Sequence, residues 1–220
     1  MKIRLLATAL LITGIGSFIC SSAAMADAGD WLVRLRALQV SPNDNSGSVS
    51  SIAGSAVGVG DDTTIELDFT YFITRNLGVE AILGSSQNNI NGKGSIAGLN
   101  KIAEVRTLPP TVTLQYHFQP DASIRPYAGL GINYTRFFDE QASSSLNSAL
   151  GPTDVALSSS WGLSGQLGVD VEFNPDWFFN FDVKYIQMNT TATLNSGGTI
   201  RRVNVDINPW FIGAGVGRRF

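Results

Sequence analysis

The side chains of this chain that could do chemistry are ionisable residues placed at every second position along apolar segments. Arg34 and Arg36, for example, alternate with Val33 and Leu35. The same spacing recurs in later segments at Glu66, Asp68, Glu80, His117, Asp170, Glu172, Asp182 and Lys184. A period of two places such residues on one face of a β-strand. Carboxylates and cations gathered on shared faces could perform acid–base chemistry, bind ions, or neutralise one another as ion pairs.

A catalytic role for these residues is the weaker interpretation. His117 is the single histidine and the natural general base, but Phe118, Gln119 and Pro120 follow it and no serine lies beside it. Acidic residues from other segments could still reach His117, yet an interior hydrogen-bonded histidine is the simpler reading. One histidine without cysteines makes no metal site, and Gly129-Leu130-Gly131 lacks the third glycine of a nucleotide-binding motif. We expect no enzyme activity, no cofactor and no metal.

The apolar residues that alternate with the charged ones predict eight strands. The expected strands are residues 30–40, 65–73, 77–83, 111–118, 128–134, 161–173, 177–186 and 203–220. In each strand one face carries Leu, Val, Ile or aromatic residues and the other carries polar or small residues. Removal of a signal peptide at residues 1–26 would leave 220 − 26 = 194 residues, which eight strands of about 11 residues with their loops fill, whereas sixteen would not fit.

The connections between these strands alternate in length. Long segments rich in Ser, Gly and Asn cover about 41–62, 85–103, 139–157 and 189–199, and short turns lie at 74–76, 119–123 and 174–176. Bacterial membrane barrels have short periplasmic turns and long extracellular loops, a rhythm that a soluble β-sandwich has no reason to keep. We therefore predict an all-β, eight-stranded antiparallel transmembrane barrel with its apolar face toward lipid. The apolar residues of the long loops either pack on one another or line an apolar mouth.

The last strand also carries the signature of a membrane barrel. Trp210 and Phe220 are ten residues apart, which at about 3.3 Å per residue and a tilt of about 40° spans roughly 25 Å, the height of an outer-membrane apolar band. We expect two aromatic girdles, formed by Trp31, Trp161, Trp177, Trp210 and Phe220. Pro209 offers a place for a bulge that would turn Val203, Val205 and Ile207 to the outside.

Residues 1–26 read as a secretory signal peptide. Lys2 and Arg4 precede an apolar run that is too short to span a membrane, and Ala24-Met25-Ala26 fits a cleavage site. Cleavage would leave residues 27–220 as the barrel, without the cysteine at position 20 and so without disulfides. The formal net charge of −3 gives no indication of a nucleic-acid partner.

Five segments of the chain carry a resemblance to a known family: LDFTYFITRNLGVE, LPPTVTLQYHF, RPYAGLGINYTRFFD, SWGLSGQLGVD and DINPWFIGAGVGRRF. Together they closely resemble the OmpW family of small outer-membrane proteins, with only the long loops unmatched. The resemblance implies a barrel in the Gram-negative outer membrane, surrounded by its lipid, with a narrow apolar channel for passive uptake of small hydrophobic molecules. It also implies bacteriocin or phage-type ligands at the loops, so a non-transporting structural or receptor protein is the alternative function. We expect a monomer.

The resemblance also places two residues at a constriction of the interior, Ile82 and Lys184, of which only Ile82 suits an apolar channel. Arg218 replaces a family aromatic residue near the carboxy-terminus. The other inward charges are expected to pair and plug the narrow barrel, although an ion pathway is a second possibility. Pro109 and Pro110 cannot donate to a ladder of hydrogen bonds. Either they mark the rim of the barrel, or they hold open a lateral gap through which a solute passes into lipid.

Overall fold

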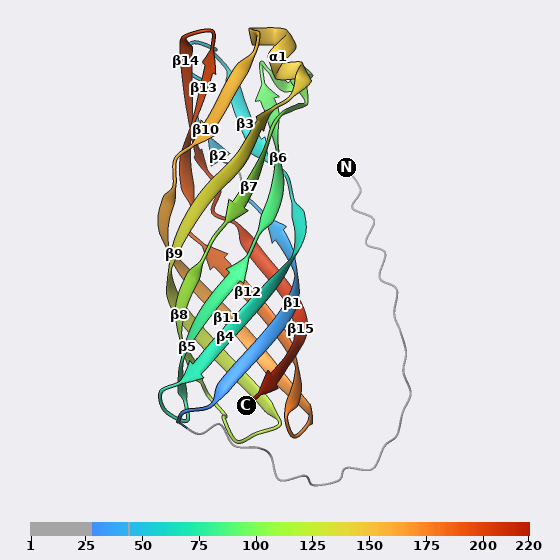
Figure 1. Ribbon diagram of the computed structural model, residues 1–220, viewed down its shortest axis with the longest axis vertical. Helices are drawn as coiled ribbons and strands as arrows, with labels where there is room; N and C mark the ends of the chain where they lie inside the picture. The colour runs from blue at the N-terminus through green and yellow to red at the C-terminus, as the bar shows by residue number, and fades with distance from the viewer. Residues whose placement is uncertain (1–27, 44) are drawn as a thin grey trace, which may run out of the picture.

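A computed structural model describes residues 28–43 and 45–220, and in it eight strands close a barrel (Figure 1). These strands are β1 (Trp31–Ser41), β4 (Asp62–Phe72), β5 (Leu77–Gly84), β8 (Thr111–His117), β9 (Ile124–Ala142), β11 (Ser160–Asn174), β12 (Trp177–Ile186) and β15 (Trp210–Arg219). All neighbours are antiparallel, and the β9–β11 pairing closes the circle. The eight-stranded antiparallel barrel expected from the sequence is confirmed. The signal peptide expected at residues 1–26 lies outside the described residues.

The two ends of the barrel differ. Short turns join β4 to β5, β8 to β9 and β11 to β12 at one end, which we call the turn end, and the chain also terminates there (Figure 1). At this end the Arg75 guanidinium lies 2.6 Å from the Asp121 carboxylate, which ties two turns together. The opposite end, the loop end, carries the long connections.

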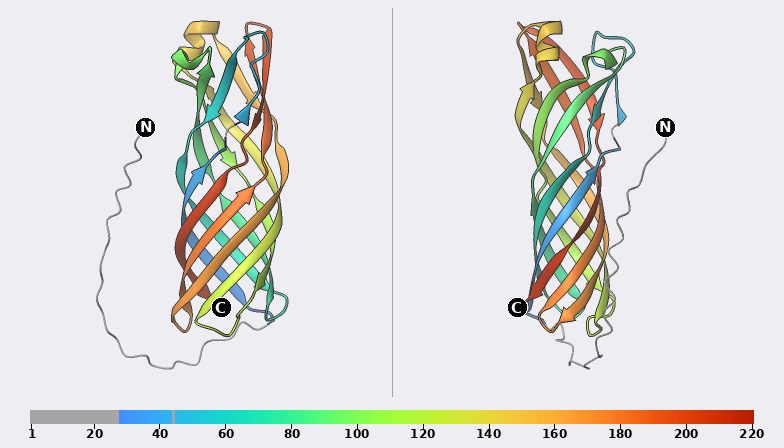
Figure 2. Two further views of the ribbon diagram at one scale, coloured as in Figure 1. Left: turned by 180° about the vertical axis from the view of Figure 1, so that it is seen from behind. Right: turned by 90° about the vertical axis from the view of Figure 1, so that its right-hand side faces the viewer.

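The long connections are not the loops expected from their composition, because most of them are folded into further strands and short helices. They contain β2 (Asn45–Ser46), β3 (Ser55–Val59), β6 (Ser86–Gly94), β7 (Lys101–Leu108), β10 (Thr153–Leu157), β13 (Asn189–Ser196), β14 (Thr199–Asp206), α1 (Ser144–Leu150) and a 3₁₀ turn, η1 (Ala97–Leu99). β3, β6 and β7 continue the barrel sheet through β9, and β10, β13, β14 and β2 form a second sheet. The wall therefore extends far beyond the turn-end half (Figure 2). No helix in the described residues is long and apolar enough to cross a membrane.

The polarity of the inward-facing side chains reverses along the barrel axis, from charged near the turn end to apolar near the loop end. On β1 the inward side chains change from Arg34 and Arg36 to Leu38 and Val40, all at most 3% exposed. In the last part of the chain Val203, Val205 and Ile207 are buried inside, on the same parity as Phe211. The expectation that a bulge at Pro209 turns these three residues outward is therefore wrong. Their outer neighbours face water instead of lipid, so the polar residues lie outside at this level.

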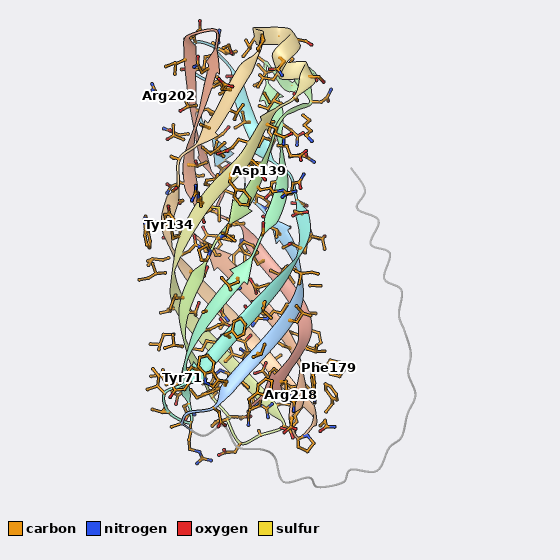
Figure 3. All side chains as sticks on the ribbon, viewed as in Figure 1. Tyr71, Tyr134, Asp139, Phe179, Arg202 and Arg218 are labelled. Carbon is orange, nitrogen blue, oxygen red and sulfur yellow. The ribbon has the colours of Figure 1, made fainter. Side chains whose placement is uncertain are left out.

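Around the turn-end half the outward side chains form a continuous apolar belt with aromatic pairs at both edges. Trp31 packs on Tyr71 near the turn end, with ring centroids 5.1 Å apart. Toward the loop end, Tyr134 packs on Trp161 at 4.8 Å and Tyr185 on Trp210 at 5.0 Å. Figure 3 shows Tyr71 and Phe179 pointing outward in the lower half, whereas Asp139 and Arg202 lie in the upper half.

The remaining aromatic residues expected in the girdles lie at the turn end. Trp177 and Phe220 are 40% and 63% exposed on the outer surface. Arg218 lies between them, with its guanidinium carbon 5.5 Å from the Trp177 ring centroid and 4.8 Å from that of Phe220. A guanidinium stacked on ring faces keeps its charge at the interface, where charged groups are tolerated in a membrane barrel.

Candidate functional site

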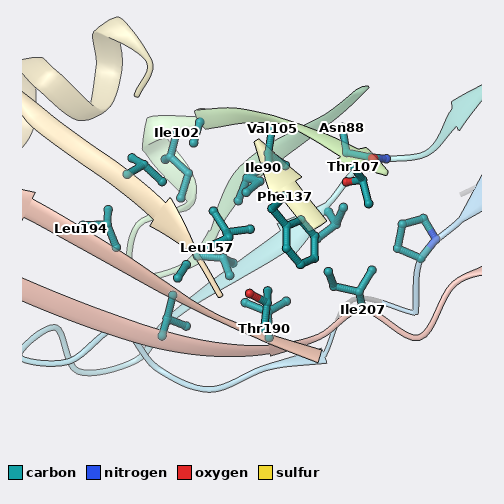
Figure 4. A pocket seen from close by; sticks show the side chains of 18 of the residues that line it. Asn88, Ile90, Ile102, Val105, Thr107, Phe137, Leu157, Thr190, Leu194 and Ile207 are labelled. Carbon is teal, nitrogen blue, oxygen red and sulfur yellow. The ribbon is translucent and has the colours of Figure 1, made fainter. Parts of the chain in front are cut away.

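The loop-end half of the molecule encloses an apolar cavity of about 170 Å³, which we call the chamber (Figure 4). Its wall comes from β3, β6, β7, β9, β13 and β14, and includes Ile90, Val105, Phe137, Leu194 and Ile207. These inward positions are apolar because the strands have water on their outer side. An engineered apolar protein cavity of about 150 Å³ stays dry and binds benzene. The chamber is therefore large enough for one small hydrocarbon.

The floor of the chamber separates it from the charged interior below. Leu38, Ile82, Ile186 and Phe211, each between 2% and 6% exposed, meet there around a void of about 20 Å³. Ile82 thus belongs to the apolar floor. Lys184 lies below it, with its ammonium 6.0 Å from the Phe211 ring centroid. The two residues of the expected constriction are therefore at different levels, one in the apolar floor and one in the charged layer.

Below the floor, charged side chains fill the barrel as a plug. Lys184 Nζ donates to both carboxylate oxygens of Glu66 at 2.9 Å, and not to Asp182 on its own strand. Arg36 lies at the centre, within 3.6 Å of four carboxylates: Glu66, Asp68, Glu80 and Asp182. Buried guanidinium and carboxylate groups tolerate this environment because each has a partner.

Arg34 organises the next layer toward the turn end. Its Nε and Nη2 donate to the two carboxylate oxygens of Asp170 at 3.2 and 2.9 Å, a bidentate pair. Its Nη1 donates to the Thr70 hydroxyl at 2.8 Å and to Glu80 at 3.5 Å. Glu80 therefore bridges the two arginine layers. Arg34, Asp170 and Glu80 are completely buried.

An aromatic layer closes the plug at the turn end. His117 packs between Tyr127, with ring centroids 5.1 Å apart, and Phe72, at 4.9 Å. One His117 ring nitrogen lies 3.2 Å from the Gln115 carbonyl oxygen. Leu32, Phe72 and Phe178 complete the layer, each 1% exposed. His117 thus contacts aromatic rings and an amide, and among the described residues no hydroxyl is hydrogen-bonded to its ring.

Some interior residues were not found from the sequence. Tyr127 donates to Asp182 at 3.1 Å and accepts from Asn180 at 3.0 Å. Arg125 lies 2.6 Å from Glu172 as a separate pair, so Glu172 is not part of the main plug. An inward glycine could have indicated the position of Tyr127 from the sequence. A Cβ at Gly168 would lie 2.3 Å from the Tyr127 ring, so the glycine leaves room for this large side chain to cross the barrel.

One seam of the wall lacks strand pairing. The β5–β8 ladder ends at Ile82 and Thr111, and the β6–β7 ladder begins in the same register at Ser86 and Thr107. Between them lie residues 83–85 on one side and 108–110 on the other, including Pro109 and Pro110. On the β9 side the wall is closed, since Tyr134 N donates to Pro110 O at 3.1 Å.

The seam lies at the level where the chamber meets its floor. Pro109 contacts both the chamber and the small void of the floor. On the outside, Leu83 and Leu108 are 49% and 38% exposed, and Leu108 pairs with Arg136 on β9, two residues beyond Tyr134. The prolines are not at the rim of the wall, because β7 continues beyond them.

A closed eight-stranded barrel with an apolar belt, aromatic edges and a charged interior defines a small outer-membrane β-barrel. The model of the OmpW family matches residues 27–220, and the chain belongs to this family. Its location is accordingly the Gram-negative outer membrane, with the turn end in the periplasm and the loop end outside.

Individual relatives agree with this assignment. The chain is 36% identical to outer membrane protein W of Vibrio cholerae over 195 residues, 87% of this chain and 89% of that protein. The crystal structure of OprG from Pseudomonas aeruginosa is similar, with a TM-score of 0.83, 33% identity, and coverage of 90% of this chain and 99% of that one. The dibenzothiophene metabolism operon protein PahQ of Pseudomonas aeruginosa is 26% identical over 213 residues, 92% of this chain and 94% of that protein.

Proposed function

We propose that this protein is a passive channel through which small apolar solutes enter the outer membrane from outside. The chamber is the site, and the observation that carries the proposal is its apolar lining directly above a sealed plug. A solute that has left water for this cavity gains the free energy of burying its apolar surface. The name of the relative PahQ refers to dibenzothiophene, an apolar aromatic compound, which supports this solute class.

A route straight through the barrel is disfavoured by the plug. An apolar molecule would have to separate Lys184 from Glu66 and Arg34 from Asp170, leaving buried charges unpaired. It would then meet the aromatic layer at the turn end. The same layers argue against a conducting ion pathway, since an ion would have to cross the apolar floor.

Release sideways into lipid at the Pro109–Pro110 seam avoids these barriers, and we include it in the proposal. A complete ladder of backbone hydrogen bonds blocks the wall of a membrane barrel, and the seam is a place where that ladder is interrupted. The void beside it measures about 20 Å³, close to the space of one water, so the strands must separate for a solute to pass. Leu83 and Leu108 would then offer an apolar surface toward the outer leaflet.

The main test is uptake of a radiolabelled small hydrocarbon by cells whose own copy of the protein has been deleted. Cells that express the protein should take up the hydrocarbon faster than cells that carry an empty vector. Equal uptake, with the barrel folded in the outer membrane, would contradict the channel. The alternative, a receptor acting through its exposed loop end, would then be preferred.

The seam is tested by replacing Pro109 and Pro110 with valine and threonine. The restored donors should extend the ladder, stabilise the barrel slightly and slow hydrocarbon uptake. Pro209→Val is the matched control, because Pro209 lines the chamber away from the seam and its carbonyl already accepts from Ile186 N at 3.2 Å. If the double variant folds and transports like the parent, release occurs elsewhere.

A further inference from the structure

Thr107 has a hydroxyl that the channel proposal does not use. It lies on β7, lines the chamber and is 6% exposed. Within the described part of the chain, its hydroxyl has no hydrogen-bond partner. A buried hydroxyl in apolar surroundings costs free energy unless something pairs with it.

The polar neighbours of Thr107 are already paired. Ser86 lies directly opposite on β6, and its hydroxyl donates to Asn88 Oδ1 at 3.0 Å. Asn88 Nδ2 in turn donates to the Gly60 carbonyl at 3.0 Å. Across the chamber, the Thr190 hydroxyl donates to the Ser158 carbonyl at 2.7 Å. Thr107 therefore offers a free donor beside a fixed polar row, at one end of an otherwise apolar chamber (Figure 4).

We propose that Thr107 and Ser86 form a head-group subsite that binds the polar end of an uncharged amphipathic solute, such as an alcohol, a phenol or a ketone. The Thr107 hydroxyl donates to the oxygen of the solute, and the Ser86 oxygen retains a lone pair that can accept from a solute hydroxyl. The apolar body of the solute packs against Ile90, Val105 and Phe137. This inference rests on the proposed channel function and narrows its solute class.

A charged head group does not fit this subsite. None of the described residues that line the chamber is charged. The nearest ionic layer, Lys184 with Glu66, is already paired and lies under the apolar floor. An ammonium or carboxylate at Thr107 would therefore be buried without a counter-ion, at a large desolvation cost.

The position of the subsite also orients the solute. Thr107 lies two residues before Pro109, directly above the interrupted ladder. A solute held by its polar end at Thr107 has that end beside Phe137, three residues beyond Tyr134 on β9, and so just on the loop-end side of the outer aromatic edge that meets the lipid head groups. On release its hydroxyl can remain at this interface while its apolar body enters the acyl chains. The head group would thus avoid crossing the hydrocarbon.

The test compares cyclohexanol with cyclohexane as ligands of the whole barrel in lipid nanodiscs. Binding is followed by NMR of the methyl groups of Ile90 and Val105. Thr107→Val keeps the side-chain shape and removes the hydroxyl, so cyclohexanol should bind roughly tenfold more weakly while cyclohexane is unchanged. Thr107→Ser should keep the preference for cyclohexanol. Thr190→Val is the control, since that hydroxyl is already satisfied, and should leave the ratio of the two affinities unchanged.

The outcomes separate the two proposals. If neither ligand shifts the chamber methyl groups, the chamber does not bind apolar solutes and the proposed function fails. If both bind and Thr107→Val leaves their affinity ratio unchanged, or tightens both equally because a water has been removed, the subsite is overturned. A measurement on the unaltered protein needs no variant: the carbinol proton of cyclohexanol should show a nuclear Overhauser effect to the Thr107 methyl group. Its absence with bound ligand would also overturn the subsite.

Discussion

Lys184 Nζ lies 2.9 Å from each carboxylate oxygen of Glu66, and Glu66 also lies 2.8 Å from Arg36 Nη1. Glu66 therefore has two cationic partners, whereas Lys184 donates hydrogen bonds to this carboxylate alone among the described residues. The two members of this ion pair therefore differ in how strongly each depends on the other, because only Glu66 has a second charged partner. Removing Glu66 leaves a buried ammonium without its hydrogen-bonded counter-ion, but removing Lys184 leaves Glu66 still paired.

This inequality predicts a non-additive double-mutant cycle. Glu66→Gln should lower the free energy of unfolding by about 3 kcal/mol and Lys184→Met by about 1 kcal/mol. The double variant should cost less than the two together, because no unpaired charge remains. Urea unfolding of the barrel in lipid vesicles measures all three values. Additivity within about 0.5 kcal/mol would mean that the two groups do not interact.

Two aspartates of the plug should respond differently to neutralisation. Asp170 accepts a bidentate pair from Arg34, and Asp170→Asn should cost about 3 kcal/mol in unfolding free energy. Asp68 lies 3.2 Å from Arg36, but neither of its oxygens has a hydrogen-bond partner in the described chain. Asp68→Asn should therefore cost about 1 kcal/mol or less. Equal costs in the same unfolding assay would contradict this ranking of the two contacts.

Two glycines of β11 give a test of the interior packing. A Cβ at Gly168 would lie 2.3 Å from the Tyr127 ring and 2.8 Å from the Phe181 carbonyl, so Gly168→Ala should destabilise the barrel by about 1–3 kcal/mol. At Gly165 the nearest atom would be 4.0 Å away, and Gly165→Ala should change stability by about 0.5 kcal/mol or less. Both barrels can be scored by the temperature at which they unfold in an electrophoretic mobility assay. A normal Gly168→Ala barrel would mean that Tyr127 does not cross at this level.

The chamber floor gives a functional prediction. Ile82→Asp would place a carboxylate among Leu38, Ile186 and Phe211, next to the seam, and should reduce hydrocarbon uptake without preventing folding. Ile82→Val keeps the floor apolar and should transport at close to the parental rate. Uptake by cells with equal amounts of each folded variant in the outer membrane measures the effect. Normal uptake by Ile82→Asp would remove Ile82 from the solute path.

The alternation of residues was enough to predict the eight membrane strands and their inward charges. It could not predict which charges pair, because partners come from different strands whose relative stagger is set by barrel closure. Asp182 lies on the same strand as Lys184, but the hydrogen-bond partner of Lys184 is Glu66, which comes from another strand. The seam was predictable in part, since proline lacks a donor, but only the structure shows on which side of β8 the pairing is interrupted.

The chamber was predicted only as one of two alternatives, an apolar mouth lined by the long connections, and the reason is different. A period of two shows which residues share a face, but not whether that face meets lipid, water or the interior. Val203, Val205 and Ile207 share the parity of Phe211, and their burial follows only once the wall is known to continue into water. The Ser, Gly and Asn content of the long connections suggested loops, but residues such as Asn89, Asn195 and Asn204 lie on the outer, hydrated face of the added strands.

The inversion of the side-chain pattern along the axis fixes how deep the barrel sits in its membrane. Moving the barrel outward by one pair of residues would lift apolar outer side chains such as Ile212 into water, and moving it inward would bring Gln39 and Thr63 into hydrocarbon. Both displacements cost free energy, so the barrel has one preferred height. In a bilayer thicker or thinner than its apolar belt, the lipid must therefore stretch or thin around the barrel. The seam would then stay at the boundary of the outer leaflet whatever the composition of the membrane.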